Sequence, residues 1–221
     1  LAPYKVQMVL FVIAFLTYGN LRGVKEAGKA FAAPTYLFIV GMYVVFIVGI
    51  YKVFNGTLEQ LSTNQEGAIK IGTEQGLLSA AAIFILLRAF ANGGSSLTGL
   101  EAISDGVALF QTPEAKNAKR TLIIMSILLG SLVLGVSWFA HKIYALPYES
   151  GSPTVISQIA KSVMGEGTFG NFWYIYVQFA TTLILFAGAN TTYSAFPLLC
   201  NFVATDGFLP KWLTKRGHRL A

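Results

Sequence analysis

The sequence feature that constrains this chain most is a long apolar segment, residues 76–110, whose middle is polar and rich in glycine. A straight membrane-spanning helix needs about 20 apolar residues. This segment is much longer, and its weakest helix formers lie at its centre. We therefore predict a helix that is broken over residues 91–99. In hydrocarbon, irregular backbone persists only where protein or a water-filled cavity satisfies its N–H and C=O groups. Broken helices of this kind hold substrates and coupling ions in secondary transporters, so the segment favours transport.

The composition indicates an integral membrane protein. Of the 221 residues, 54% are hydrophobic and 12% are charged, whereas a soluble domain carries about 25% charged residues. A single cysteine, Cys200, excludes an internal disulfide framework, and two distant histidines form no metal constellation. We predict no cofactor and no metal site. Neither His141 nor His218 has a nucleophile at a recognised motif spacing, so the sequence does not favour an enzyme.

Four further apolar segments have the length of membrane-spanning helices. They are residues 4–20, 30–51, 121–143 and 172–198. Together with the broken segment they predict five crossings and an all-α, multi-pass protein of the cell membrane. Because the chain does not start with Met, we expect it to be a segment of a longer protein.

Two smaller features lie near the last crossing. Residues 154–164 have the apolar spacing of a short helix lying on the surface. Trp173, Tyr174 and Tyr176 open the crossing itself, and such amphipathic aromatics are typical of a membrane interface.

The orientation follows from the basic residues, because cytoplasmic loops carry the excess of Lys and Arg. Of the 16 Lys and Arg, ten lie in one set of alternate loops and five in the other, and Arg88 lies within a span. The set of ten is predicted to face the cytoplasm. This topology accounts for the net charge of +6, so we expect the lipid bilayer as a partner and no nucleic acid. The ten are Arg22, Lys25, Lys29, Lys116, Lys119, Arg120, Lys211, Lys215, Arg216 and Arg219.

Three polar residues follow the break at helical spacing. Thr98, Glu101 and Asp105 share one face of a helix that starts near Leu97. Two carboxylates one turn apart repel if both ionise, so we expect one of them to hold a proton or a cation. Acids within a membrane are usually functional, which makes Glu101 and Asp105 candidates for proton coupling. In the alternative interpretation, Thr98 and Glu101 form a capping box and Asp105 is solvated.

The break itself offers two kinds of ligand. Carbonyl groups at the end of its first half, near residues 90–92, suit a cation, and amide groups at the start of its second half suit a carboxylate. An amino-acid zwitterion would use both, whereas a potassium ion would use the carbonyls together with Thr98 and Glu101. Alternatively, the glycines allow close helix packing. The predicted substrate or ion ligands are Thr98, Glu101, Gly93, Gly94, Ser95, Ser96 and Gly99.

Two further polar features lie within predicted spans. Arg88 lies about 18 Å along the helix from residue 76, too deep to snorkel easily, and we expect Glu101 or an acid on a helix outside this chain to pair with it. The last span contains several hydroxyl and amide groups. They are predicted to bond their own backbone or to form a second ion site. They are Thr181, Thr182, Asn190, Thr191, Thr192 and Ser194.

Several of these motifs together resemble a known family. Residues 98–104 (TGLEAIS), followed by Pro113, Glu114 and Asn117, are similar to the sixth span and following loop of the amino acid-polyamine-organocation (APC) superfamily of permeases. Residues 20–24 (NLRGV) resemble the loop between its fourth and fifth spans. Residues 189–197 and the tail resemble the KimA-type potassium/proton symporter group within it.

This resemblance implies a LeuT-type fold of two inverted five-helix repeats, of which the chain would hold spans four to eight. In the potassium group a Thr and a Glu of the sixth span line the ion pathway, and they match Thr98 and Glu101. Their other ligands come from the first and third spans, which lie outside this sequence. Asp105 departs from the Asn expected there, and residues 30–51 contain no Lys that could sense protons.

The leading functional hypothesis is a secondary active transporter, a proton-coupled symporter, of potassium or a similar small cation in a bacterial inner or plasma membrane. Its partners would be the cation, protons, the bilayer and the remaining spans of the same transporter. One alternative is an amino-acid permease of the same superfamily. Another is a non-transporting membrane sensor or scaffold module, in which the break serves only packing.

Overall fold

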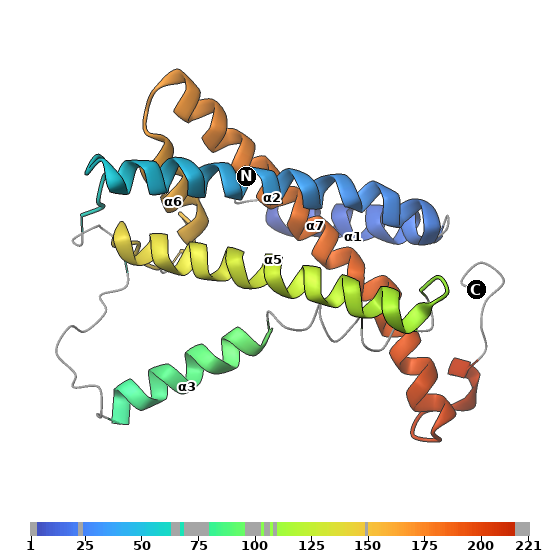
Figure 1. The fold of residues 1–221 in the computed structure, drawn as a ribbon. Helices are drawn as coiled ribbons and strands as arrows, with labels where there is room; N and C mark the ends of the chain where they lie inside the picture. The colour runs from blue at the N-terminus through green and yellow to red at the C-terminus, as the bar shows by residue number, and fades with distance from the viewer. Residues whose placement is uncertain are drawn as a thin grey trace. The chain divides into compact units, whose positions relative to one another are not determined.

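The computed structural model describes residues 4–21, 24–62, 67–68, 80–95, 103, 107, 110–148 and 150–214. Apart from one isolated bridge between Ala68 and Tyr148, the regular structure in these residues is helical (Figure 1). The chain forms two compact units, Leu1–Val45 with Glu166–Ala221, and Phe46–Gly165. The helices are α1 (Lys5–Leu21), α2 (Val24–Phe54), α3 (Ala80–Ser95), α5 (Glu114–Lys142), α6 (Val155–Met164), α7 (Thr168–Thr205) and the 3-10 helix η3 (Lys211–Thr214).

Three of these helices contain segments long and apolar enough to cross a membrane, namely Ala32–Phe54, Glu114–Lys142 and Thr168–Tyr193. They correspond to the second, fourth and fifth predicted spans. Helix α1 has 17 residues and is at the short end of the range. Helix α3 has 16 residues, or about 24 Å, which is less than the roughly 30 Å of a hydrocarbon core.

Two of the long helices begin several residues before the predicted spans. Helix α2 begins at Val24 rather than residue 30, and α5 begins at Glu114 rather than residue 121. Both extensions consist largely of Ala, Lys, Glu and Arg, which are strong helix formers. Glu114 also places a carboxylate in the first turn of α5, where the helix dipole favours negative charge. The apolar residues therefore predicted the membrane-spanning part of each helix but not the position where the helix begins.

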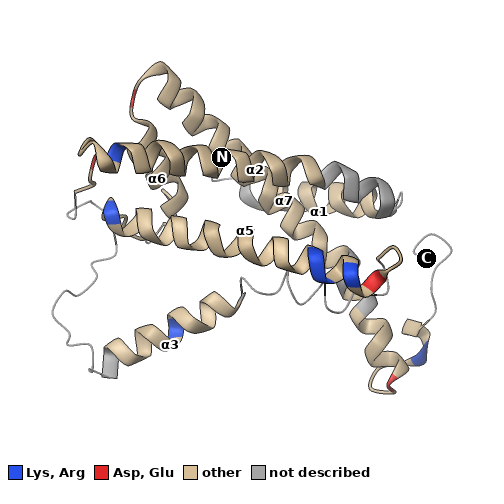
Figure 2. Ribbon diagram, in the orientation of Figure 1, with Lys and Arg blue, Asp and Glu red and all other residues tan. Residues whose placement is uncertain are grey.

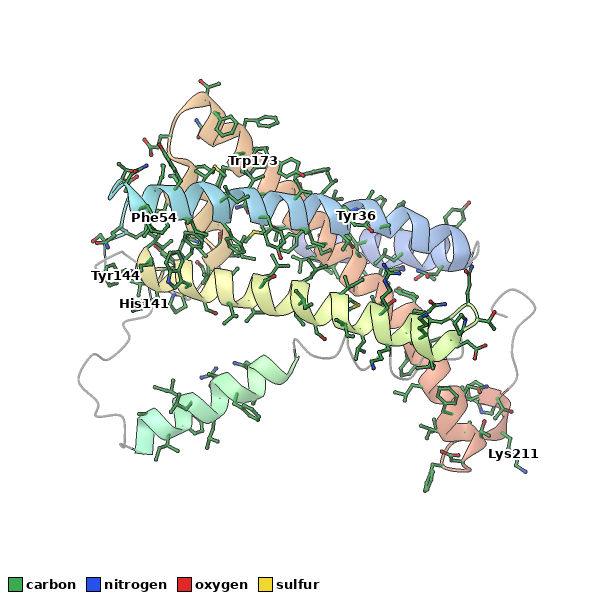
Figure 3. All side chains as sticks on the ribbon, viewed as in Figure 1. Tyr36, Phe54, His141, Tyr144, Trp173 and Lys211 are labelled. Atoms are coloured by element: carbon green, nitrogen blue, oxygen red, sulfur yellow. The ribbon has the colours of Figure 1, made fainter. Side chains whose placement is uncertain are left out.

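In the first unit, α7 packs closely on the first part of α2. A Cβ added to Gly41 would lie 2.9 Å from Tyr176 Cε1, so this glycine makes room for the ring. Tyr176 OH donates to Leu37 O at 3.0 Å, and Trp173 Nε1 donates to Gly41 O at 3.4 Å (Figure 3 labels Trp173). Two of the predicted interface aromatics therefore tie α7 to α2 as well.

In the second unit, aromatic rings join the end of α2 to α5. The Phe46 and Phe139 rings stack with centroids 5.5 Å apart, and both side chains are buried. Two glycines leave the space for these rings. A Cβ added to Gly135 would lie 2.6 Å from Phe46 Cζ, and a Cβ added to Gly49 would lie 2.5 Å from Phe139 Cζ. Val163 of α6 also lies against Gly49, 3.2 Å from that Cβ position.

Helix α6 is the short helix predicted at residues 154–164, and its beginning is capped because Thr154 Oγ1 accepts from Ser157 N at 3.2 Å. Its predicted position on the surface is wrong, because seven of its ten residues are buried. Gln158 bonds both the N–H and the C=O of Leu146, at 3.1 and 2.8 Å. Ser162 donates to the backbone oxygen of Glu59. Because these hydrogen bonds satisfy the polar side chains, the polar face of α6 can be buried as well as its apolar face.

Candidate functional site

The end of α3 carries the part of the predicted site that the structure describes. Helical backbone continues to Ser95, so residues 91–95 of the predicted break are helical. The helix thus ends about one turn later than the expected position near residues 90–92. Gly93 and Gly94 lie in this last turn, and a Cβ added to either would meet no atom within 4 Å. No close helix contact among the described residues therefore explains this glycine pair.

The remaining predicted ligands lie outside the described residues. They are Ser96, Thr98, Gly99 and Glu101, together with Asp105 as the second candidate for proton coupling. The break over residues 96–99 and the shared face of the two acids therefore stay predictions.

Arg88 lies near the middle of α3 and is exposed, as are all residues from 83 to 94. Figure 2 shows a basic residue in the middle of this otherwise uncharged helix. Within the described part of the chain, no carboxylate forms an ion pair with Arg88. The partner predicted for it, Glu101 or an acid on another helix, is thus not among the residues described.

The structure brings a second polar group together in the first unit, where α1 meets α7. Asn20 Nδ2 donates to Asn190 Oδ1 and, at 2.8 Å, to Leu16 O. One turn away, Thr17 Oγ1 and Tyr193 OH lie 2.9 Å apart, and Thr17 Oγ1 donates to the backbone of its own helix. Asn190 is 9% exposed. This pair of contacts, which we call the α1–α7 polar junction, joins two helices by side-chain hydrogen bonds.

Sequence reasoning missed this junction, although a signal was present. Thr17 and Asn20 are three residues apart, and so are Asn190 and Tyr193, which puts each pair on one helix face. Two apolar helices that each carry such a pair can form two matching hydrogen bonds. Nothing in the spacing says which helices will meet.

The hydroxyl groups of α7 that were considered for a second ion site bond their own helix. Thr181 donates to Val177 O at 2.7 Å, and Thr182 donates to Gln178 O at 2.9 Å. Thr191 and Thr192 make the same kind of bond, to carbonyls three residues earlier. The Ser194 side chain lies outside what the structure describes. These contacts favour the structural interpretation of the hydroxyls.

Comparison with known proteins identifies the family. The sequence profile described as "Amino acid permease" matches residues 3–221. Potassium transporter KimA of Bacillus subtilis is 38% identical over 220 residues, which is all of this chain and 34% of the length of KimA. The chain therefore spans about a third of this curated relative. These matches confirm the predicted resemblance to the APC superfamily and to its KimA group. The chain belongs to the amino acid permease family of the APC superfamily.

Proposed function

We propose that the complete protein is a proton-coupled secondary transporter that moves potassium, or a similar small cation, across a bacterial inner membrane. The observation that carries this proposal is the 38% identity to a potassium transporter over the whole of this chain. The chemistry agrees, because Glu101 supplies a carboxylate and Thr98 a hydroxyl oxygen, and hard monovalent cations take oxygen ligands. Such a protein is a carrier and not an enzyme.

In this proposal the fold is the LeuT type, and the chain holds its spans four to eight. The start of the second half of the broken helix carries the ion ligands, and spans outside this chain complete the site. Glu101 holds the proton that crosses together with the cation as the site changes from one side of the membrane to the other, and it releases both on the far side. Asp105, one turn further on, adds a second negative charge that attracts the cation and competes for the proton.

Flux through the complete protein tests the proposal. Proteoliposomes that contain it should take up rubidium, a potassium analogue, when an inward proton gradient is imposed. Glu101→Gln should remove most of this proton-dependent uptake, because the amide neither binds a proton nor carries charge at neutral pH. Glu166→Gln is the matched control, since Glu166 is an exposed carboxylate in the loop before α7 and should leave uptake unchanged.

Two outcomes distinguish the role of Glu101 in proton coupling from potassium transport by the protein as a whole. Unchanged proton coupling in Glu101→Gln would remove Glu101 from the mechanism while leaving transport intact. An absence of rubidium uptake by the wild-type protein would contradict potassium transport itself.

A second candidate, an amino-acid permease, is supported by the description of the matching family. A labelled amino-acid mixture offered to the same proteoliposomes distinguishes it, because only this candidate predicts uptake that rubidium and potassium do not inhibit. Uptake of neither substrate would favour a membrane sensor or scaffold.

A further inference from the structure

Helix α3 differs from the other long helices in that its residues 83–94 are all exposed. Large apolar side chains on it, such as Phe84 and Phe90, have 65% and 83% of their surface exposed. An apolar helix of this kind is stable in lipid or against other apolar helices. Its single charged residue, Arg88, is stable in neither setting without a partner.

The polar residues of α3 lie on one face of the helix. Asn92 follows Arg88 by four residues, so the two side chains are neighbours on the helix surface. Leu86 and Phe90 are displaced from Arg88 by two residues and lie on the opposite face. From Arg88 to Asn92 one face of the helix is therefore polar, and Leu86 and Phe90 mark the apolar opposite face. Phe84 and Ile85, one turn before Arg88, keep the start of the first face apolar.

We propose that the polar face of α3 packs, in the complete protein, against a membrane helix outside this chain that presents a carboxylate to Arg88. The inference rests on the proposed function only in that the chain is one part of a longer membrane carrier. The length of the missing part is adequate, because this chain corresponds to 34% of KimA. Charge complementarity selects the partner, since a planar guanidinium pairs with a carboxylate through two parallel hydrogen bonds.

The described acids do not provide this carboxylate. Glu59, Glu114, Glu166 and Asp206 lie in loops or at helix ends, and Glu26 lies in the first turn of α2. None of these five is in the interior of a membrane-spanning segment. Glu101 and Asp105 lie outside the described residues. We assign the partner to a span outside this chain, and the cross-linking experiment below distinguishes such a span from these two acids.

A lipid phosphate is the competing partner, and the position of Arg88 argues against it. At about 1.5 Å per residue, Arg88 is about 10 Å from the end of α3 at Ser95 and farther from its start. A headgroup at either end of the helix is thus distant. Asn92 adds an amide that can bond the same partner, and lipid tails offer nothing to either residue.

A photo-crosslinking amino acid in place of Arg88, in the complete protein reconstituted in bilayers, tests the inference. Mass spectrometry should find a peptide from outside residues 1–221 with an Asp or Glu within one helical turn of the linked residue. Cross-links only to lipid, or to a peptide of this chain such as the one containing Glu101, would overturn the proposal. The same amino acid at Leu86 is the matched control and should not link to that peptide.

Charge exchange then tests the pairing. Arg88→Asp should lower the thermal midpoint of the complete protein, and changing the identified acid to Arg should restore it. If Arg88→Asp prevents insertion, the experiment uses Arg88→Gln and the change of the identified acid to its amide instead. The thermal midpoint of the double variant should then fall by less than the sum of the two falls in the single variants. No restoration, or full additivity, would overturn the pairing. Neither measurement reads flux, so these results are independent of whether the protein transports potassium.

Discussion

The aromatic junction of α2, α5 and α6 and the helix α3 are opposite kinds of glycine-bearing membrane segment. In the junction, Gly49 and Gly135 let phenylalanine rings come so close that a single added methyl group would clash. In α3, Gly93 and Gly94 have open space around them, and the neighbouring apolar side chains are exposed. The same residue type serves packing in one place and is left uncovered in the other.

The two regions differ in which polar groups find partners among the described residues. In the second unit, the buried polar residues of α6 have partners within the unit, as Gln158 and Ser162 show. In α3, Arg88 and Asn92 have no such cover among the described residues. A region whose glycines and polar groups are both satisfied can act as a rigid scaffold. In α3 the described residues pack against neither the glycine pair nor Arg88 and Asn92, and the proposals above assign this packing to spans outside this chain.

The largest expected effect comes from removing the central ring of the junction. Phe139→Ala should destabilise the complete protein by roughly 3 kcal/mol, because it leaves a cavity beside Phe46 and removes the edge contact with Trp138 at 4.8 Å. Thermal unfolding in detergent measures this loss. Phe54→Ala is the control, since Phe54 is 85% exposed and should cost far less. Equal losses at the two positions would contradict a junction that stabilises by packing.

Adding a methyl group to the same junction should also lower the stability, because it overfills the space that Phe139→Ala would empty. Gly135→Ala should cost about 1–3 kcal/mol, because the buried ring of Phe46 must move. Gly130→Ala adds the same group to the same helix where no atom lies within 4 Å, and it should be neutral or slightly stabilising. The difference between the two midpoints is the quantity to measure. Equal midpoints would show that the ring moves aside freely.

Removing the polar anchor of α6 should cost about 2 kcal/mol. Gln158→Leu leaves the N–H and C=O groups of Leu146 without their partner and also removes a contact with Pro153 O at 3.2 Å. Lys161→Leu is the matched control, because Lys161 is an exposed residue of the same helix. Hydrogen exchange at Leu146 should become faster in the first variant alone. Unchanged exchange there would mean that water replaces the amide at no cost.

How far the sequence predicts the fold can be judged from particular helices. The apolar runs identified the three helices of the described residues that are long and apolar enough to cross a membrane, because hydrocarbon demands apolar surface wherever a helix meets it. The ends of α2 and α5 were missed, because helix formers continue beyond the apolar part. The burial of α6 was missed because Gln158 looks like a polar surface residue, and its bonds to Leu146 span 12 positions of the sequence.

The candidate site is less predictable for a different physical reason. Thr98 and Glu101 could be chosen from residue type and spacing alone, because an acid near a helix break is costly in a membrane. In the proposed function their ligand geometry depends on spans outside this chain, and a local sequence pattern does not predict contacts between distant segments. The α1–α7 polar junction shows the same limit, since Asn20 and Asn190 are 170 positions apart.

The smallest expected effect is on α3 itself, and its sign sharpens the comparison best. Gly93→Ala should stabilise the helix by about 0.5–1 kcal/mol if the space around it stays open, because alanine loses less backbone entropy than glycine. The thermal midpoint of the complete protein measures the change, with Gly130→Ala as the reference for an uncovered glycine. A loss of stability at Gly93 but not at Gly130 would mean that another span covers this turn in the complete protein. The uncovered glycines of α3 would then belong to the same class as those of the aromatic junction.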